Sequence, residues 1–214
     1  NGDNIIDEQM NFSLKSGSST VAGLSPFKGL LDVMSRLGVK LPQRESRYRR
    51  LLGDLLSSAR SPAEKRAKVK LSGMFFTDVM NGIDAASRNN PRAFKAGLFN
   101  VMKRATFGTD LANVIDVDKT TIKEITVDHI NELEATTGNL RVEQAPSGYS
   151  LGGQAITGRR FFMTGPNAPK GHLLQFRFKF RPGDEQKIYK ELKLQILLGG
   201  GAYLPKADKN KKKR

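Results

Sequence analysis

Residues 174–180, with the sequence Leu-Gln-Phe-Arg-Phe-Lys-Phe, alternate strictly between apolar and polar side chains. This is the period of a β-strand with one buried face. The alternation predicts that the apolar residues face a core and the polar residues face outward: Leu174, Phe176, Phe178 and Phe180 inward, Gln175, Arg177 and Lys179 outward. Residues 192–198 repeat the pattern, and the turn-forming sequence Arg-Pro-Gly-Asp at 181–184 lies between the two runs. A pair of half-buried strands needs another layer of structure to cover its apolar face.

The chain before residue 108 has a helical period instead. Ser25-Pro26 is a helix start signal, and Gly38 is the matching stop. A second helix is predicted over residues 44–59, a third begins at Ser61-Pro62, and a fourth begins at Pro91. Gly73 is expected to weaken or break the third helix.

Further strand-like runs follow residue 108, at 120–125, 140–142 and 160–163. Helices followed by strands predict an α+β fold, with a helical N-terminal half packed on a mainly antiparallel, β-rich C-terminal half and with flexible termini. The expected organisation is a flexible arm (1–25), a basic helical region (26–107), a β-rich region that shares a core with the helices (108–205) and a basic disordered tail (206–214).

The 214-residue chain has a formal net charge of +15, and this charge is unevenly distributed. Residues 38–104 hold fifteen basic and five acidic side chains, whereas residues 105–150 hold three basic and eight acidic ones. An excess of this size attracts polyanions, either nucleic acid or an anionic membrane surface. The acidic block offers the basic block a partner, within one molecule or between neighbouring molecules.

The basic residues expected to contact nucleic acid or an anionic surface fall in four groups: Arg44, Arg47, Arg49 and Arg50; Lys65, Arg66, Lys68 and Lys70; Arg159 and Arg160; and Lys209, Lys211, Lys212, Lys213 and Arg214. Like charges at helical spacing repel each other unless a polyanion lies opposite them. The alternative is that these residues form ordinary solvated helix faces and a solubilising tail.

No pattern in the sequence indicates catalysis. The chain has no cysteine, and its glycine-rich segment 148–153 lacks the Lys and Ser/Thr of a phosphate-binding loop. Asp116, Asp118, Asp128 and His129 are read as surface residues rather than as a metal site. The inward phenylalanines of residues 174–180 are read as core and not as a base-stacking platform. The sequence therefore predicts a non-enzymatic protein without cofactor or metal.

The leading hypothesis is a viral structural protein of the capsid, nucleocapsid or matrix type, which self-assembles and binds nucleic acid without sequence specificity. RNA is favoured over DNA, a homo-oligomer is expected, and the site of action would be the virion or the host cytoplasm, with the basic tail also compatible with the nucleus. Two alternatives stay open: a cellular RNA- or ribosome-associated module, and a matrix protein bound to an anionic membrane.

Overall fold

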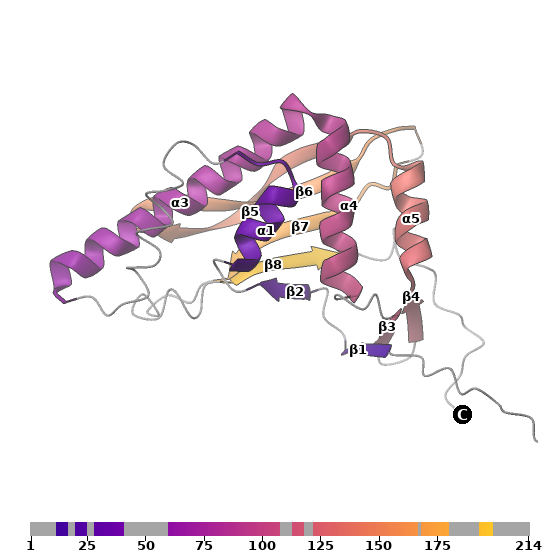
Figure 1. The fold of residues 1–214 in the computed structure, drawn as a ribbon, viewed down its shortest axis with the longest axis horizontal. Helices are drawn as coiled ribbons and strands as arrows, with labels where there is room; N and C mark the ends of the chain where they lie inside the picture. Colours follow the sequence, from indigo (N-terminus) through magenta and orange to yellow (C-terminus); the bar gives the residue numbers. More distant parts are fainter. Residues whose placement is uncertain are drawn as a thin grey trace, which may run out of the picture.

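A computed structural model describes residues 12–16, 20–24, 28–40, 60–107, 113–117, 122–166, 168–179 and 193–198. The fold is α+β, as predicted: α1, α3 and α4 cover one face of a five-stranded antiparallel sheet, and a small three-stranded sheet lies beside α5 (Figure 1). The helices are α1 (Lys28–Arg36), α3 (Pro62–Asn89), α4 (Pro91–Phe107) and α5 (Val127–Thr136). The strands are β1 (Phe12–Ser16), β2 (Thr20–Leu24), β3 (Asn113–Val117), β4 (Ile122–Ile125), β5 (Leu140–Leu151), β6 (Gln154–Met163), β7 (Leu174–Lys179) and β8 (Lys193–Leu198). No described helix is both long enough and apolar enough to cross a bilayer.

The two alternating segments of the sequence are neighbours in the larger sheet. Its strand order is β2-β8-β7-β6-β5, and every neighbouring pair in it is antiparallel. The smaller sheet has the order β1-β3-β4, in which β1 runs parallel to β3. The strands predicted over 174–180 and 192–198 are confirmed as β7 and β8.

Several elements lie where the sequence predicted none. The predicted arm contributes β1 and β2, whose partners β3 and β8 come from distant parts of the chain. Helix α5 interrupts the β-rich region; its start is a capping box in which the Thr126 and His129 side chains accept each other's backbone N–H. The predicted helix over 44–59, the Ser25-Pro26 start signal and the tail 206–214 lie outside the described residues.

One apolar cluster contains residues from the helices and from the larger sheet. The ring centroids of Phe76 in α3 and Phe178 in β7 lie 4.3 Å apart. Those of Phe94 in α4 and Phe161 in β6 lie 6.0 Å apart. Leu174, Phe176 and Phe178 are all buried on this side of the sheet, which confirms the inward direction predicted for them.

Helix α3 is the longest described element and begins as predicted, with Ser61 as its N-cap and Pro62 in the first turn. Gly73 does not break it. A Cβ added at Gly73 would lie 2.1 Å from the backbone oxygen of Leu151, at the end of β5. The glycine therefore allows the β5–β6 hairpin to contact the helix backbone. Gly152 and Gly153 form the two-residue turn of that hairpin with φ values of 59° and 78°, the positive range of a type I′ turn.

A buried ion pair joins the C-terminal part of α3 to β6. Arg159 is only 2 % exposed, and its guanidinium donates to both carboxylate oxygens of Asp84, at 2.7 and 2.9 Å. Its Nη1 donates to the backbone oxygens of Thr157 and Gly158 and to the Thr157 hydroxyl. A buried charge is tolerated when its donors are satisfied in this way.

We predict that Asp84→Asn lowers the free energy of unfolding by about 3 kcal/mol, because it leaves the buried Arg159 charge without a counter-charge. The matched control is Asp32→Asn, which removes the same charge from the exposed Asp32–Arg36 pair on α1. We expect Asp32→Asn to lower the free energy of unfolding by less than about 1 kcal/mol. Urea unfolding of both variants measures the difference, and equal losses would contradict the structural role of the Arg159–Asp84 pair.

We also predict that Gly73→Ala destabilises the protein by about 1–3 kcal/mol, because the added methyl group overlaps the Leu151 carbonyl and neither backbone can move freely. Gly171→Ala is the control, since a Cβ at Gly171 would meet no atom within 4 Å. Thermal unfolding distinguishes the two variants. A stabilised Gly73→Ala protein would show that the hairpin does not pack on α3 as described.

Candidate nucleic-acid interface

Four of the predicted binding residues lie in the first three turns of α3: Lys65, Arg66, Lys68 and Lys70. These turns extend beyond the ends of the strands in Figure 1, so the basic part of the helix projects from the body of the fold. Two of the other three groups of the prediction lie outside the described residues: Arg44, Arg47, Arg49 and Arg50, and the basic residues from Lys209 to Arg214.

The helix N-terminus itself is already occupied by side chains of α3. The Ser61 hydroxyl accepts the backbone N–H of Glu64 at 3.2 Å, and the Glu64 carboxylate accepts the backbone N–H of Arg60 at 2.7 Å. Lys68 forms an ion pair with Glu64 at 2.9 Å. The hydrogen bond from Lys68, followed by that from the Arg60 backbone, lowers the pKa of the Glu64 carboxyl. Glu64 therefore supplies the negative charge that the helix dipole favours here, and Lys68 is engaged with it.

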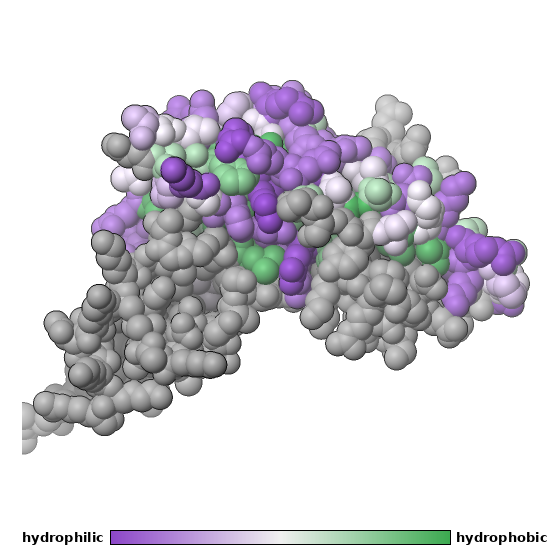
Figure 2. Space-filling model, turned by 180° about the vertical axis from the view of Figure 1, so that it is seen from behind, coloured by the Kyte–Doolittle hydropathy of each residue, from purple (hydrophilic) through white to green (hydrophobic). Residues whose placement is uncertain are grey.

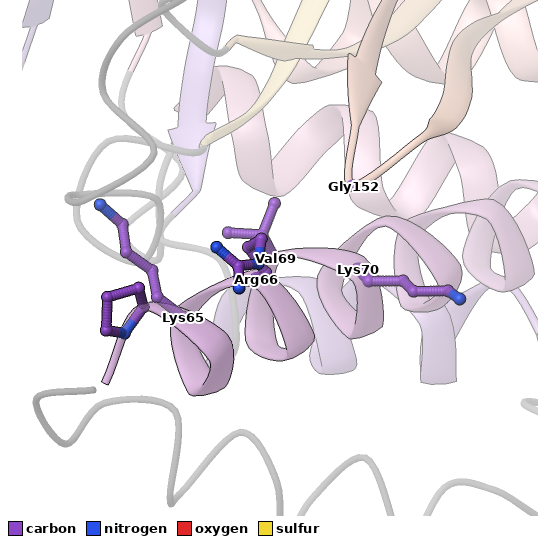
Figure 3. Close-up of a pocket in the computed structure, with 6 residues that line it drawn as sticks. Lys65, Arg66, Val69, Lys70 and Gly152 are labelled. Carbon is purple, nitrogen blue, oxygen red and sulfur yellow. The ribbon is translucent and has the colours of Figure 1, made fainter. Parts of the chain in front are cut away.

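The remaining three basic residues line a hollow of about 630 Å³ between the start of α3 and the turn of the β5–β6 hairpin. The lining residues are Pro62, Lys65, Arg66, Val69, Lys70 and Gly152. Figure 3 shows the side chains of Lys65 and Lys70 pointing to opposite sides of the view, with that of Arg66 between them. Gly152 meets the helix here, since a Cβ on it would lie 2.4 Å from the Cα of Lys70.

No acidic side chain of the described residues lines this hollow or forms an ion pair with Lys65, Arg66 or Lys70. Arg66 and Lys70 are separated by four positions, a spacing at which like charges destabilise a helix. The three charges spread over about 7.5 Å of helix axis instead of converging on one point. This arrangement suits an extended polyanion better than a single small anion, since each cation is placed to contact a different phosphate.

The prediction for Arg159 is wrong. Its guanidinium is buried and bound to Asp84, Thr157 and Gly158, so an external phosphate cannot reach it. The physical reason is the strand period: Arg159 pairs with the core residue Phe176 in the sheet register and shares its inward face. The sequence placed two arginines side by side but did not reveal which of them faced the helices.

Arg160 lies on the opposite face of the sheet and is half-buried. It pairs with Gln175 in the register of β6 and β7, and its Nε lies 3.4 Å from the Gln175 side-chain oxygen. Arg160 is thus on a different side of the molecule from Arg159, and it does not line the hollow at α3. Gln175, expected to face outward, does lie on this outer face but is only 8 % exposed.

Among the described residues, one ion pair connects the basic and acidic blocks. Lys103 of α4 contacts Glu134 of α5 at 2.7 Å, and Lys95 of α4 donates to the backbone oxygen of Thr137 at the end of α5. These contacts use cations of α4 for packing, in contrast to Lys65, Arg66 and Lys70, which form no ion pair with another described residue.

The described residues contain no group of three metal-ligating side chains. The His129 ring is engaged in the capping box of α5, where its Nδ1 lies 2.9 Å from the Thr126 hydroxyl. Asp118 lies outside the described residues, and Asp116 belongs to β3.

Sequence reasoning missed three of the described lining residues, Pro62, Val69 and Gly152. The sequence indicates no more than a glycine-rich loop over residues 148–153, whereas β5 continues to Leu151 and the position of Gly152 beside Lys70 depends on the packing of the hairpin against α3. The chain matches no protein-family model, no curated protein and no solved structure.

Proposed function

We propose that this protein binds nucleic acid without sequence specificity, through phosphate contacts along the first turns of α3, and that its role is structural rather than enzymatic. The observation that carries the proposal is the hollow lined by Lys65, Arg66 and Lys70, whose charges have no ion-pair partner among the described residues. Phosphate contacts of this kind release counterions and carry no base information, so they give affinity without sequence preference.

The proposed role in an assembly is that of a capsid, nucleocapsid or matrix-type subunit. It is supported by the net charge of +15 and by the separation of basic and acidic blocks along the chain. A protein with this charge binds nucleic acid and is concentrated by it, which promotes contacts between copies.

We predict that the triple variant Lys65→Gln, Arg66→Gln, Lys70→Gln binds single-stranded RNA more weakly and with a shallower salt dependence. Each lost phosphate contact removes about 0.7 from the slope of log K against log salt, so the slope should fall in magnitude by about 2. Fluorescence anisotropy across a salt series measures both effects.

The matched control is Arg88→Gln, Arg92→Gln, Arg104→Gln, which removes the same charge from three exposed residues at the far end of α3 and on α4. Arg88 lies about 33 Å along the helix axis from Arg66. Equal slopes for the two triple variants would overturn the assignment of the site to the start of α3. Binding to acidic liposomes that exceeds binding to RNA would assign the same cations to an anionic membrane instead.

We further predict that nuclease-treated protein forms larger particles when RNA is added at low salt and that these dissociate at high salt. Light scattering measures their mass. A constant monomer mass in every condition would refute the assembly role and leave an RNA-binding module. Particles that grow to the same mass without added RNA would refute a role for RNA in assembly.

A further inference from the structure

The face of the five-stranded sheet opposite to the helices carries a second set of cations. Figure 2 views the molecule from this side, where hydrophilic residues predominate over the described part and small hydrophobic patches lie among them. The sheet register places Arg141, Arg160 and Phe162 of β5 and β6 on this face. Gln175 and Arg177 of β7 and Gln195 of β8 continue the same face.

Two guanidinium groups on this face are each held by a glutamine. The Nε–H of Arg177 donates to the side-chain oxygen of Gln195 at 2.8 Å. The Nε–H of Arg160 donates to the side-chain oxygen of Gln175 at 3.4 Å. Both glutamines are nearly buried, at 8 and 9 % exposure, and are therefore fixed supports. An arginine has five N–H donors, so each contact at Nε leaves the Nη donors available.

Arg160 and Arg177 differ from Arg159 in the groups that accept their hydrogen bonds. No carboxylate of the described residues forms an ion pair with Arg160 or Arg177, whereas Arg159 is bound by Asp84. Arg160 and Arg177 are diagonal neighbours on adjacent strands, about 7–8 Å apart at their Cα atoms. Two oriented guanidinium forks at this separation are placed to contact two different phosphates of one strand.

An aromatic surface lies beside the Arg160 and Arg177 guanidinium groups in the sheet register. The Arg141 guanidinium carbon lies 4.6 Å from the centre of the Phe162 ring, which is half-buried. The His172 ring packs against the same phenylalanine edge-on, with 6.2 Å between centroids. Arg141 also forms an ion pair with Glu143, the one carboxylate among the residues that the register places on this face of β5 and β6. Nucleobases stack both on aromatic rings and on guanidinium planes, so the Phe162–Arg141 pair is a surface for a base.

We propose that this face binds single-stranded nucleic acid, with phosphates on Arg160 and Arg177 and a base stacked on the Phe162–Arg141 pair. The proposal deepens the proposed function by adding a second site with a different substrate preference. A duplex keeps its bases stacked inside the helix and cannot offer one to Phe162, so this face should distinguish single strands from duplexes. None of the described residues that line the site at the start of α3 is aromatic, so that site should bind both forms.

His172 reports on occupation of this site. Burial, followed by the positive charge of Arg160, lowers the pKa of His172. A phosphate bound at Arg160 would offset that charge and raise the pKa of His172 toward its usual value. The only other histidine of the chain, His129, lies in the α5 capping box and serves as an internal control.

The first experiment compares the binding of a short oligouridine and of an RNA duplex of equal length to Phe162→Leu and Phe162→Tyr proteins. We expect Phe162→Leu to bind oligouridine about tenfold more weakly, since a stacked base contributes about 1–3 kcal/mol, and to bind the duplex as before. Phe162→Tyr keeps a stacking ring and should retain the affinity for oligouridine. Unchanged oligouridine binding by Phe162→Leu, or an equal loss for the duplex, would overturn the proposal.

The second experiment needs no variant. Histidine ring resonances of the unaltered protein are followed by NMR while oligouridine is added. We expect the His172 signals to move and the His172 pKa to rise, while the His129 signals stay in place. If the signals of both histidines stay in place at saturating oligouridine, the proposal is overturned. The proposed function is tested separately, by the triple variant of α3.

Discussion

The ion pair between Arg159 and Asp84 fixes where α3 lies on the sheet, and the rest of the interface depends on that position. A buried guanidinium needs its counter-charge and its acceptors close by, so the C-terminal part of α3, which carries Asp84, lies over β6. With the helix held there, Gly73 meets the end of β5 and the hairpin turn at Gly152 meets Lys70. The hollow at the basic end of α3 is thus a consequence of packing that occurs several turns away.

Two arginines adjacent in the sequence illustrate how burial decides the role of a charge. Arg159 is satisfied inside the protein and stabilises the contact between helix and sheet. Arg160 is held only at its Nε and faces the other way. The same contrast applies to the helices, where Lys103 is paired with Glu134 whereas Lys65, Arg66 and Lys70 have no described partner. In the proposed function, net charge supplies the attraction for a polyanion, and the oriented cations without a described partner are the groups expected to set where it binds.

Local patterns in the sequence predicted much of the fold. The Ser61-Pro62 start of α3 and the alternation in β7 and β8 were recognisable because capping and strand periodicity are properties of neighbouring residues. Strands β1 and β2 were missed because their partners are distant in the chain. Of the candidate sites, the cations of α3 were predicted, whereas Phe162 was not. Phe161 and Phe162 are adjacent, and only the register with β5 and β7 determines that the second of them faces away from the core.

The pairing of β1 with β3 and of β2 with β8 has a consequence for the order of folding. Phe12 pairs with Asn113, and Thr20 pairs with Leu197, so the first strands of this chain are synthesised long before their partners. A nascent chain can form α3 and α4 from local contacts, but it cannot complete the larger sheet until residue 197 has left the ribosome. Closing such long loops is entropically costly and slow. During that interval the strand-forming segments near the N-terminus remain available to a second chain, which makes neighbouring nascent chains competitors for the same pairing.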